Sequence, residues 1–274
     1  MALSSVAAPR LGCGVSGMST AITPPAIALD RVSKAFGATL AVDDVSLTIP
    51  AGQFVVVVGA SGSGKTTLLK LINRLVDADT GRVTVGGADV AATPAPTLRR
   101  GIGYVFQGIG LLPHLTVAAN IGIVPRLLGW ERDAIAARVA ELLALVELDL
   151  GVATRLPAAL SGGQRQRVGV ARALAAKPGV VLLDEPFGAL DPLTRDGLAT
   201  RYRDLHDRLG LTSVLVTHDM QEALLLADRV VVVAHGRIVA DAAPAALVHG
   251  HADPGVAAML AVPRRQAERL AAML

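Results

Sequence analysis

Residues 59–66, GASGSGKT, have the types and spacing that a phosphate-binding loop requires. They follow an apolar run, residues 54–58, and precede a predicted helix over residues 66–75. The glycines let the backbone curl so that successive N–H groups and the helix N-terminus point at phosphate oxygens. The Lys65 ammonium should then reach the β and γ phosphates, and the Thr66 hydroxyl should bind Mg²⁺. The residues expected to contact the phosphates are Gly59, Ala60, Ser61, Gly62, Ser63, Gly64, Lys65, Thr66 and Thr67.

Two adjacent acids follow a second apolar run, residues 180–183. Asp184 and Glu185 therefore stand at the carboxyl end of a predicted strand, where open α/β sheets place ligands. Neighbouring side chains on an extended segment point in opposite directions, so we expect different roles. Asp184 is expected to hold a metal through its water shell, and Glu185 to polarise the water that attacks the γ-phosphate. Taken alone, the pair could equally be helix-capping acids before Pro186.

A second candidate anion site is SGGQ at residues 161–164, which opens a predicted helix over residues 165–176. A serine at a helix N-cap, next to free glycine N–H groups, can bind an anion. By itself the segment is better explained as an ordinary capped helix start. Together with residues 59–66, however, it gives the chain two phosphate-binding helix termini for one nucleotide. The candidate residues are Ser161, Gly162, Gly163 and Gln164.

Gln107 ends a predicted apolar strand and begins the loop sequence QGIGLLPHLT. A plain surface turn would be small and polar, so this loop is predicted to contact a ligand or a partner. Gly108 and Gly110 give this loop conformational freedom. The Leu-Leu-Pro step at residues 111–113 would then present an apolar edge to a partner. The alternative is that these leucines pack against neighbouring helices.

Two further polar residues are predicted near the acids. His218 ends the apolar run at residues 213–217, so it should lie at the same sheet edge as Asp184, within reach of a γ-phosphate. Its expected role is hydrogen bonding and orientation. Asp191 follows the two acids too closely in sequence to lie far from them.

The elements that position these residues predict an α/β fold. Short, continuously apolar runs of β-branched residues indicate strands covered on both faces, and helical segments lie between them. Alternating strands and helices predict a parallel, doubly wound core. The strand runs are residues 54–58, 180–183, 213–217 and 229–233, and the helical segments are residues 66–75, 195–209 and 221–227.

Two other regions do not fit that alternation. Residues 27–29, 45–49 and 81–86 alternate like half-buried antiparallel strands and predict a small β-layer. In the stretch 115–177, amphipathic helices are predicted over residues 131–146 and 165–176, with no strand run between them. We therefore expect a helical subdomain, approximately residues 108–177, inserted into the α/β core.

Composition narrows the classes of partner. The chain has 274 residues and a net charge of +3, and no apolar run reaches the ~18–20 residues that span a bilayer. Its arginines are scattered rather than clustered on a stripe, which disfavours nucleic acid. The single cysteine, Cys13, fits a reducing compartment. Residues 1–25 are expected to be a disordered extension, with Met18 as an alternative start.

Taken in order, the motifs resemble those of ABC ATPases over residues 26–250. Phe36 matches the aromatic residue that stacks on adenine in that family. The alternative interpretation is that Phe36 is a core aromatic residue on a strand. The motifs that correspond to the Walker A, Q-loop, signature, Walker B, D-loop and H-loop motifs are residues 59–66, Gln107, residues 160–164, Asp184-Glu185, residues 189–191 and His218.

The resemblance implies a P-loop NTPase (RecA-like) core with an antiparallel β-subdomain and an inserted helical subdomain. It implies ATP and Mg²⁺ as cofactors, with Glu185, His218, Gln107 and Lys65 in catalysis and Thr66, Gln107 and Asp184 at the metal. It also implies a head-to-tail homodimer, in which each ATP lies between residues 59–66 of one copy and residues 161–164 of the other, with Asp191 nearby.

Within the family, four stretches resemble the ATPases of importers for glycine betaine, choline or proline. The implied partners are integral membrane permease subunits and, indirectly, a substrate-binding protein, at the cytoplasmic face of the membrane. Residues 251–274 should form a short helical tail that packs through an apolar face containing Leu270, Met273 and Leu274. The tail leaves no room for the paired CBS domains that many such subunits carry. The four stretches are residues 71–75, 107–114, 124–130 and 191–196.

Two alternatives stay open. One is an importer subunit for another solute, such as an amino acid, a sugar or a metal. The other is a soluble ABC ATPase that acts on nucleic acid or ribosomes; such proteins commonly carry two ATPase units or a long coiled-coil insertion, and neither is present in this sequence.

Overall fold

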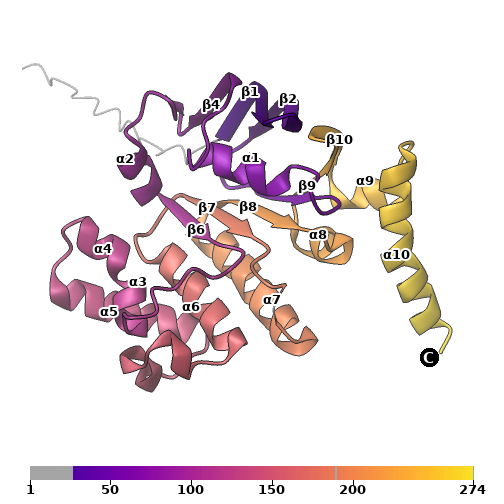
Figure 1. The fold of residues 1–274 in the computed structure, drawn as a ribbon. Coiled ribbons are helices and arrows are strands. Elements are labelled where there is room, and N and C mark those ends of the chain that lie inside the picture. The colour runs from indigo at the N-terminus through magenta and orange to yellow at the C-terminus, as the bar shows by residue number, and fades with distance from the viewer. Residues whose placement is uncertain (1–26, 189, 274) are drawn as a thin grey trace, which may run out of the picture.

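A six-stranded sheet forms the centre of the protein (Figure 1). The computed structural model describes residues 27–188 and 190–273, so the expectations for residues 1–25 lie outside the described part. The strand order is β10-β9-β3-β8-β7-β6, and every neighbouring pair is parallel except β9 and β10. The strands are β3 (Phe54–Val58), β6 (Ile102–Val105), β7 (Val180–Asp184), β8 (Thr212–Thr217), β9 (Arg229–Ala234) and β10 (Arg237–Ala242).

A smaller antiparallel sheet, in the order β2-β1-β4-β5, lies over one face of this core. Helix α1 (Lys65–Ile72) packs between the two sheets. The predicted β-layer is therefore confirmed, although its first two strands are longer than the alternating patterns suggested. They are β1 (Ile27–Phe36), β2 (Thr39–Ile49), β4 (Thr80–Val85) and the two-residue β5 (Ala88–Asp89).

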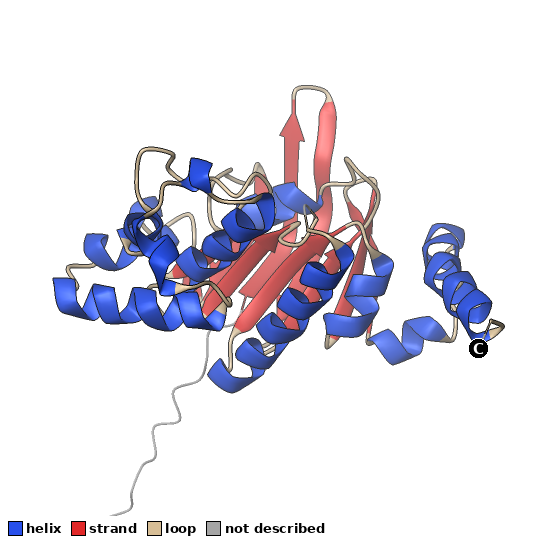
Figure 2. Cartoon of the chain, turned by 90° about the horizontal axis from the view of Figure 1, so that it is seen from below, coloured by secondary structure: helices blue, strands red, loops and turns tan. Residues whose placement is uncertain are grey.

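Helices cover the other face of the six-stranded sheet (Figure 2). Those after β6 gather at one side of the core and form the predicted helical subdomain (Figure 1). The helices of that subdomain are α3 (Val117–Ile121), α4 (Ile123–Leu127), α5 (Arg132–Leu145) and α6 (Gly162–Leu174), with 3₁₀ turns at Leu150–Thr154 and Pro157–Ala159. The remaining helices are α2 (Ala95–Arg100), α7 (Pro192–Leu209), α8 (Met220–Leu226), α9 (Pro244–Val248) and α10 (Pro254–Ala271).

The side chains of β3 show why this strand is continuously apolar. Phe54, Val56 and Val58 belong to the core beneath the sheet, whereas Val55 and Val57 belong to the core between the two sheets. All five side chains are fully buried. A strand that must fill two cores has no polar face, which is the pattern of parallel sheets covered on both sides.

The end of the chain differs from expectation. The tail contains α10, a helix of 18 residues with Pro263 inside it, rather than only short helices. Its first half packs, because Val256 and Leu260 are buried, but Met273 is 80% exposed. The prediction that Met273 helps to pack the tail is wrong, since α10 extends beside the core beyond its contact with α8. Leu274 lies outside the described residues.

A buried hydrogen-bonded chain joins α7 to the edge of β3. His206 Nε2 lies 3.2 Å from the carbonyl oxygen of Gly52 and must donate to it, which leaves Nδ1 to accept from the Ser213 hydroxyl at 2.9 Å. The Ser213 oxygen in turn lies 2.8 Å from the Tyr202 hydroxyl. Burial, aided by the nearby Arg203 charge, lowers the pKa of His206. The folded protein therefore holds His206 neutral.

This lowered pKa predicts a loss of stability in mild acid. Above the unfolded-state pKa of about 6.5 the histidine is neutral in both states. As pH falls below that value, the unfolded chain takes up the proton first, so the free energy of unfolding decreases until the folded pKa is reached. Urea unfolding at pH 7.5 and 5.5 should show a smaller decrease for His206→Gln than for the unsubstituted protein. The exposed His249→Gln is the control; equal decreases in all three proteins would contradict the prediction.

Candidate functional site

Four adjacent strands end at one edge of the large sheet, and each delivers part of the candidate site. In spatial order these strands are β3, β8, β7 and β6. The phosphate loop (residues 59–66) follows β3, His218 follows β8, and Asp184 and Glu185 lie at the end of β7. The glutamine loop (residues 106–116), which contains Gln107, follows β6. The prediction that His218 lies at the same sheet edge as Asp184 is confirmed, because β7 and β8 are parallel neighbours.

The phosphate loop approaches other backbone segments so closely that glycine is required. Gly64 has a φ of 108° and is the N-cap of α1, and no side chain caps that helix. A Cβ on Gly64 would overlap the carbonyl oxygen of Ala41, and one on Gly59 would overlap that of Val233. Ser63 Oγ is buried and has no hydrogen-bond partner among the described residues. An uncapped helix N-terminus beside an unpaired buried hydroxyl fits a nucleotide phosphate.

Lys65 lies folded into this loop. Its Nζ donates to the carbonyl oxygens of Gly59 at 2.8 Å and Ala60 at 2.7 Å. Burial lowers the pKa of Lys65, while the charges of Glu185 and Asp184 act in the opposite direction. The ammonium is thus held at the mouth of the phosphate loop, where phosphate oxygens could replace the two carbonyls as acceptors.

Thr66 and Asp184 meet at the position expected for a metal ion. The Thr66 hydroxyl donates to Asp184 Oδ1 at 2.9 Å, and burial raises the pKa of Asp184. Within the described residues, no group of three or more His, Cys, Asp or Glu side chains could hold a metal. One hydroxyl and one carboxylate fit Mg²⁺, which keeps several waters and takes its other ligands from phosphate oxygens.

Glu185 lies between two polar side chains. Gln107 Nε2 is 3.2 Å from Glu185 Oε2, and His218 Nδ1 is 3.3 Å from Oε1. The prediction that Asp184 and Glu185 both lie on an extended segment is wrong, because β7 ends at Asp184 and Glu185 has a φ of 47°. The turn in the chain nevertheless separates the two carboxylates: one contacts Thr66, and the other contacts Gln107 and His218.

Phe36 is a surface residue, not a core aromatic. It ends β1, its side chain is 50% exposed, and Lys34 Nζ lies 5.5 Å from its ring centroid. The β1–β2 hairpin that carries it also contains Ala41, whose carbonyl oxygen faces Gly64 of the phosphate loop. An exposed aromatic face on this hairpin is available for stacking on a planar base.

The signature segment (residues 160–164) is not part of this cluster. Ser161 and Gln164 form a reciprocal capping box at the start of α6. Asp191 caps α7 and accepts from the Thr194 N–H at 3.0 Å. Among the described residues, no hydrogen bond or ion pair joins these two helix starts to the phosphate loop. One chain therefore assembles the phosphate, metal and carboxylate groups but leaves the second anion site separate.

Two residues that were not predicted hold the glutamine loop in place. Asn120 is fully buried, accepts from the Leu112 N–H at 2.8 Å and donates to the carbonyl oxygens of Leu112, Leu115 and Thr116. Arg172 of α6 donates to the carbonyl oxygens at the start of the loop. Asn120 lies in a short apolar segment without a recognisable motif, so the sequence carries no signal of this role.

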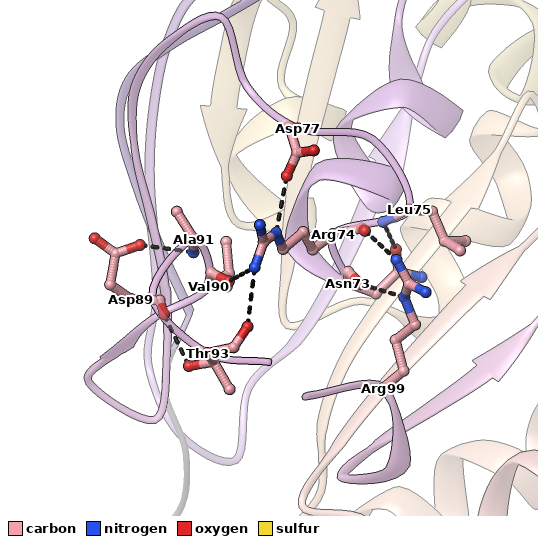
Figure 3. Close-up of polar contacts among 9 residues, drawn as sticks. All are labelled: Asn73, Arg74, Leu75, Asp77, Asp89, Val90, Ala91, Thr93 and Arg99. Carbon is pink, nitrogen blue, oxygen red and sulfur yellow. Dashed lines mark hydrogen bonds and ion pairs between the residues drawn. The ribbon is translucent and has the colours of Figure 1, made fainter. Parts of the chain in front are cut away.

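The far end of α1 is fixed by a second group of contacts (Figure 3). Arg99 of α2 donates to the carbonyl oxygens of Asn73, at 3.3 Å, and Arg74. Arg74 in turn contacts Asp77 at 2.8 Å and the Thr93 carbonyl oxygen at 3.0 Å. These bonds anchor α1, and with it the phosphate loop at its other end, to the segment between β5 and α2.

A groove of about 300 Å³ separates this anchored region from the helical subdomain. Leu112 lies on its wall, so the loop leucine is accessible from the groove, whereas Leu111 packs against the core. Three arginines surround an apolar floor, which suits a partner segment that is apolar with a negative charge. Its lining includes Leu75, Arg99, Arg100, Phe106, Leu112 and Arg172.

The fold and the site define a class of protein. A parallel sheet with a phosphate loop after one strand and an acidic pair after another is the arrangement of P-loop NTPases. The protein resembles the solved structure of MJ0796, a dimeric bacterial ABC transporter cassette, with a TM-score of 0.75 and 33% sequence identity. The matched region covers 80% of this chain and 98% of the MJ0796 chain. A second MJ0796 structure, a dimer bound to ADP and Pi, gives a TM-score of 0.73 at 33% identity, with the same coverage.

Sequence comparisons place the chain more narrowly. The ABC transporter family model matches residues 42–188. The glycine betaine uptake system ATP-binding protein YehX of Escherichia coli is 51% identical over 80% of this chain and 71% of its own length. The chain therefore belongs to the ABC transporter family, and its described part has the fold of the ATP-binding cassette. The prediction of an ABC ATPase fold is confirmed.

Two other relatives widen the range of solutes. The glycine betaine/carnitine/choline transport ATP-binding protein OpuCA of Bacillus subtilis is 49% identical over 77% of this chain, which spans 56% of OpuCA. The sulfate/thiosulfate import ATP-binding protein CysA 2 of Agrobacterium fabrum is 50% identical over 80% of this chain and 64% of its own length.

No helix in the described ranges is long and apolar enough to cross a membrane.

Proposed function

We propose that the chain is the ATP-hydrolysing subunit of an importer for osmoprotectants such as glycine betaine, choline or carnitine. The observation that carries the catalytic part is the Glu185 carboxylate, held between Gln107 and His218 beside the contact between Thr66 and Asp184. A carboxylate with two positioned neighbours, next to a phosphate loop, is the arrangement needed to activate a water for attack on a γ-phosphate.

The side chains then divide the steps of hydrolysis between them. Lys65 exchanges its two carbonyl acceptors for oxygens of the β and γ phosphates. Glu185 accepts the proton of the attacking water, and His218 and Gln107 keep the carboxylate and that water oriented. Thr66, Asp184 and Gln107 would hold Mg²⁺, which supplies positive charge to the phosphate oxygens when it is bound. Phe36 stacks on the base.

The separation of the signature segment from the phosphate loop supports a head-to-tail homodimer. Ser161 and its neighbours present an N-terminus of α6 that serves no nucleotide within one chain, and Asp191 starts the helix beside it. In the proposed dimer the signature segment of one copy contacts the phosphates held by the other. Each site is then incomplete without the partner copy, so hydrolysis depends on dimer closure.

The groove is the proposed contact with integral membrane permease subunits. It lies directly beside the glutamine loop, so a segment bound there can move Gln107. An apolar floor with three arginines suits a permease segment that carries an acidic residue. This contact would hold the chain at the cytoplasmic face of the membrane, with a substrate-binding protein acting indirectly.

The solute is proposed from the relatives. YehX is named for uptake of glycine betaine and OpuCA for transport of glycine betaine, carnitine and choline, whereas CysA 2, at a similar identity, is named for sulfate and thiosulfate. Identity alone therefore leaves an importer for another solute as the second candidate. Local stretches that resemble osmoprotectant importers favour the first candidate.

Reconstitution of the complete importer tests the proposal. The chain, its permease subunits and its substrate-binding protein should be co-expressed and inserted into vesicles. We expect glycine betaine or choline to raise ATP hydrolysis about fivefold or more, the usual range of coupling between sites. The same complex with Glu185→Gln is the control for background hydrolysis. Stimulation by sulfate, an amino acid, a sugar or a metal, and not by these compounds, would overturn the osmoprotectant assignment.

A further inference from the structure

Arg172 has no part in the hydrolysis mechanism proposed above. It lies in the last turn of α6, and its Nη1 and Nη2 donate to the carbonyl oxygens of Gly110 at 2.6 Å and Ile109 at 2.7 Å. Its guanidinium also lies 5.7 Å from the ring centroid of Phe106. One side chain thus contacts three residues of the glutamine loop, two of them through backbone atoms that any substitution in the loop would retain.

The loop conformation depends on this contact. Ile109 has a φ of 63°, a region that β-branched residues avoid. Its side chain lies against α6 at Gly169, where a Cβ would come within 3.2 Å of Ile109 Cγ2. The bonds from Arg172 and the space left by Gly169 together hold the isoleucine in a conformation that it would not adopt alone.

The same helix reaches the other parts of the machinery. Its N-terminus is the signature segment, and Gln166 donates to the carbonyl oxygen of Pro186, directly after Glu185. A packed helix of 13 residues can carry a displacement along its axis as a rigid element. Movement of the glutamine loop at one end of α6 therefore reaches the anion site at the other.

We propose that Arg172 is a positioning residue that locks the glutamine loop to α6, so that Gln107 and the signature segment move as one body. Only one consequence of this inference rests on the proposed head-to-tail dimer. In that dimer α6 of one copy completes the site of its partner, so the lock links the sites of the two copies. Arg172 also lines the groove, so a segment bound there contacts the lock itself.

Arg167 provides a matched control. It lies on the same helix, and its Nη1 also donates to backbone carbonyl oxygens, those of Glu147 at 3.1 Å and Val146 at 3.5 Å. Glu147 and Val146 lie directly after α5, whereas the glutamine loop follows β6. Replacing Arg167 by methionine should therefore disturb α6 packing to a similar degree but leave the glutamine loop attached.

The first measurement follows the loop directly and needs no nucleotide. Spin labels are attached at Gly108→Cys, where a Cβ meets open space, and at Ala137→Cys on the exposed face of α5, in a full chain with Cys13→Ser. We expect one narrow distance distribution in this background and with Arg167→Met, and a broad one with Arg172→Met. Equal distributions for Arg172→Met and the background, or equal broadening with Arg167→Met, would overturn the lock.

The second measurement is kinetic. With Arg172→Met, kcat for ATP hydrolysis should decrease between about tenfold and 10²-fold, the cost of misplacing a reacting group, while the KM for ATP stays within about twofold. Arg172→Lys should restore part of kcat because an ammonium can still donate to both carbonyls. A raised KM with unchanged kcat would contradict the role. Since the spin-label distances are measured without nucleotide, they test the lock even if the proposed function is wrong.

Discussion

Replacing Glu185 by glutamine is expected to lower the rate of ATP hydrolysis by ~10²–10⁴-fold while ATP binding is retained. The amide is the same size and can still contact Gln107 and His218, which lie 3.2 and 3.3 Å from the carboxylate oxygens. It cannot accept a proton from water. The phosphate loop is unchanged, so nucleotide affinity should change little.

Two measurements on this variant separate chemistry from assembly. Single-turnover hydrolysis reports the chemical step, and light scattering with Mg²⁺ and ATP should show the mass of a dimer that no longer separates. Glu141→Gln is the control, since Glu141 is exposed and pairs with Arg138 on α5. Turnover retained at more than about a tenth of the starting value would remove Glu185 from the role of general base.

Replacing Gly64 by alanine is expected to abolish nucleotide binding and to destabilise the fold. The new Cβ would overlap the carbonyl oxygen of Ala41, a backbone atom of β2 that cannot rotate away. The φ of 108° adds a penalty for any residue with a side chain. Overpacking and unfavourable φ together cost on the order of 2–5 kcal/mol. Relief of the overlap requires a shift of the first turn of α1, which carries the N–H groups of the phosphate loop.

Gly62 offers a control within the same loop. It also has a positive φ, 77°, but a Cβ there would meet nothing within 4 Å. Gly62→Ala should therefore cost only about 1–2 kcal/mol of unfolding free energy and weaken nucleotide binding less. Urea unfolding and calorimetric titration with ATP compare the two variants. If Gly62→Ala is as damaging as Gly64→Ala, the contact with Ala41 is not the cause.

The site could largely be predicted because its motifs lie directly after strands. Once residues 54–58, 180–183 and 213–217 are assigned to one parallel sheet, chain geometry alone brings Lys65, Asp184 and His218 to a common edge. Sequence order says nothing of where the strand before Gln107 lies, and the structure puts β6 at the edge of the sheet, next to β7.

What could not be predicted depends on contacts between residues far apart in the chain. Arg172 and Ile109 are separated by 63 positions, and neither belongs to a pattern that indicates the bond between them. The φ of Glu185 is likewise set by packing and not by residue type, since glutamate does not favour that region. The amphipathic pattern of the tail indicated helix but not that α10 would leave Met273 exposed.

The strand order has a consequence for how the chain folds during synthesis. The strands that carry the phosphate loop and the acidic pair, β3 and β7, do not pair with each other; β8 lies between them and bonds to both. β8 is also synthesised last of the three, at residues 212–217. A ribosome-bound chain that ends before residue 212 lacks the strand that hydrogen-bonds to both, so we expect ATP to be a poor folding template until more than three quarters of the 274 residues have emerged.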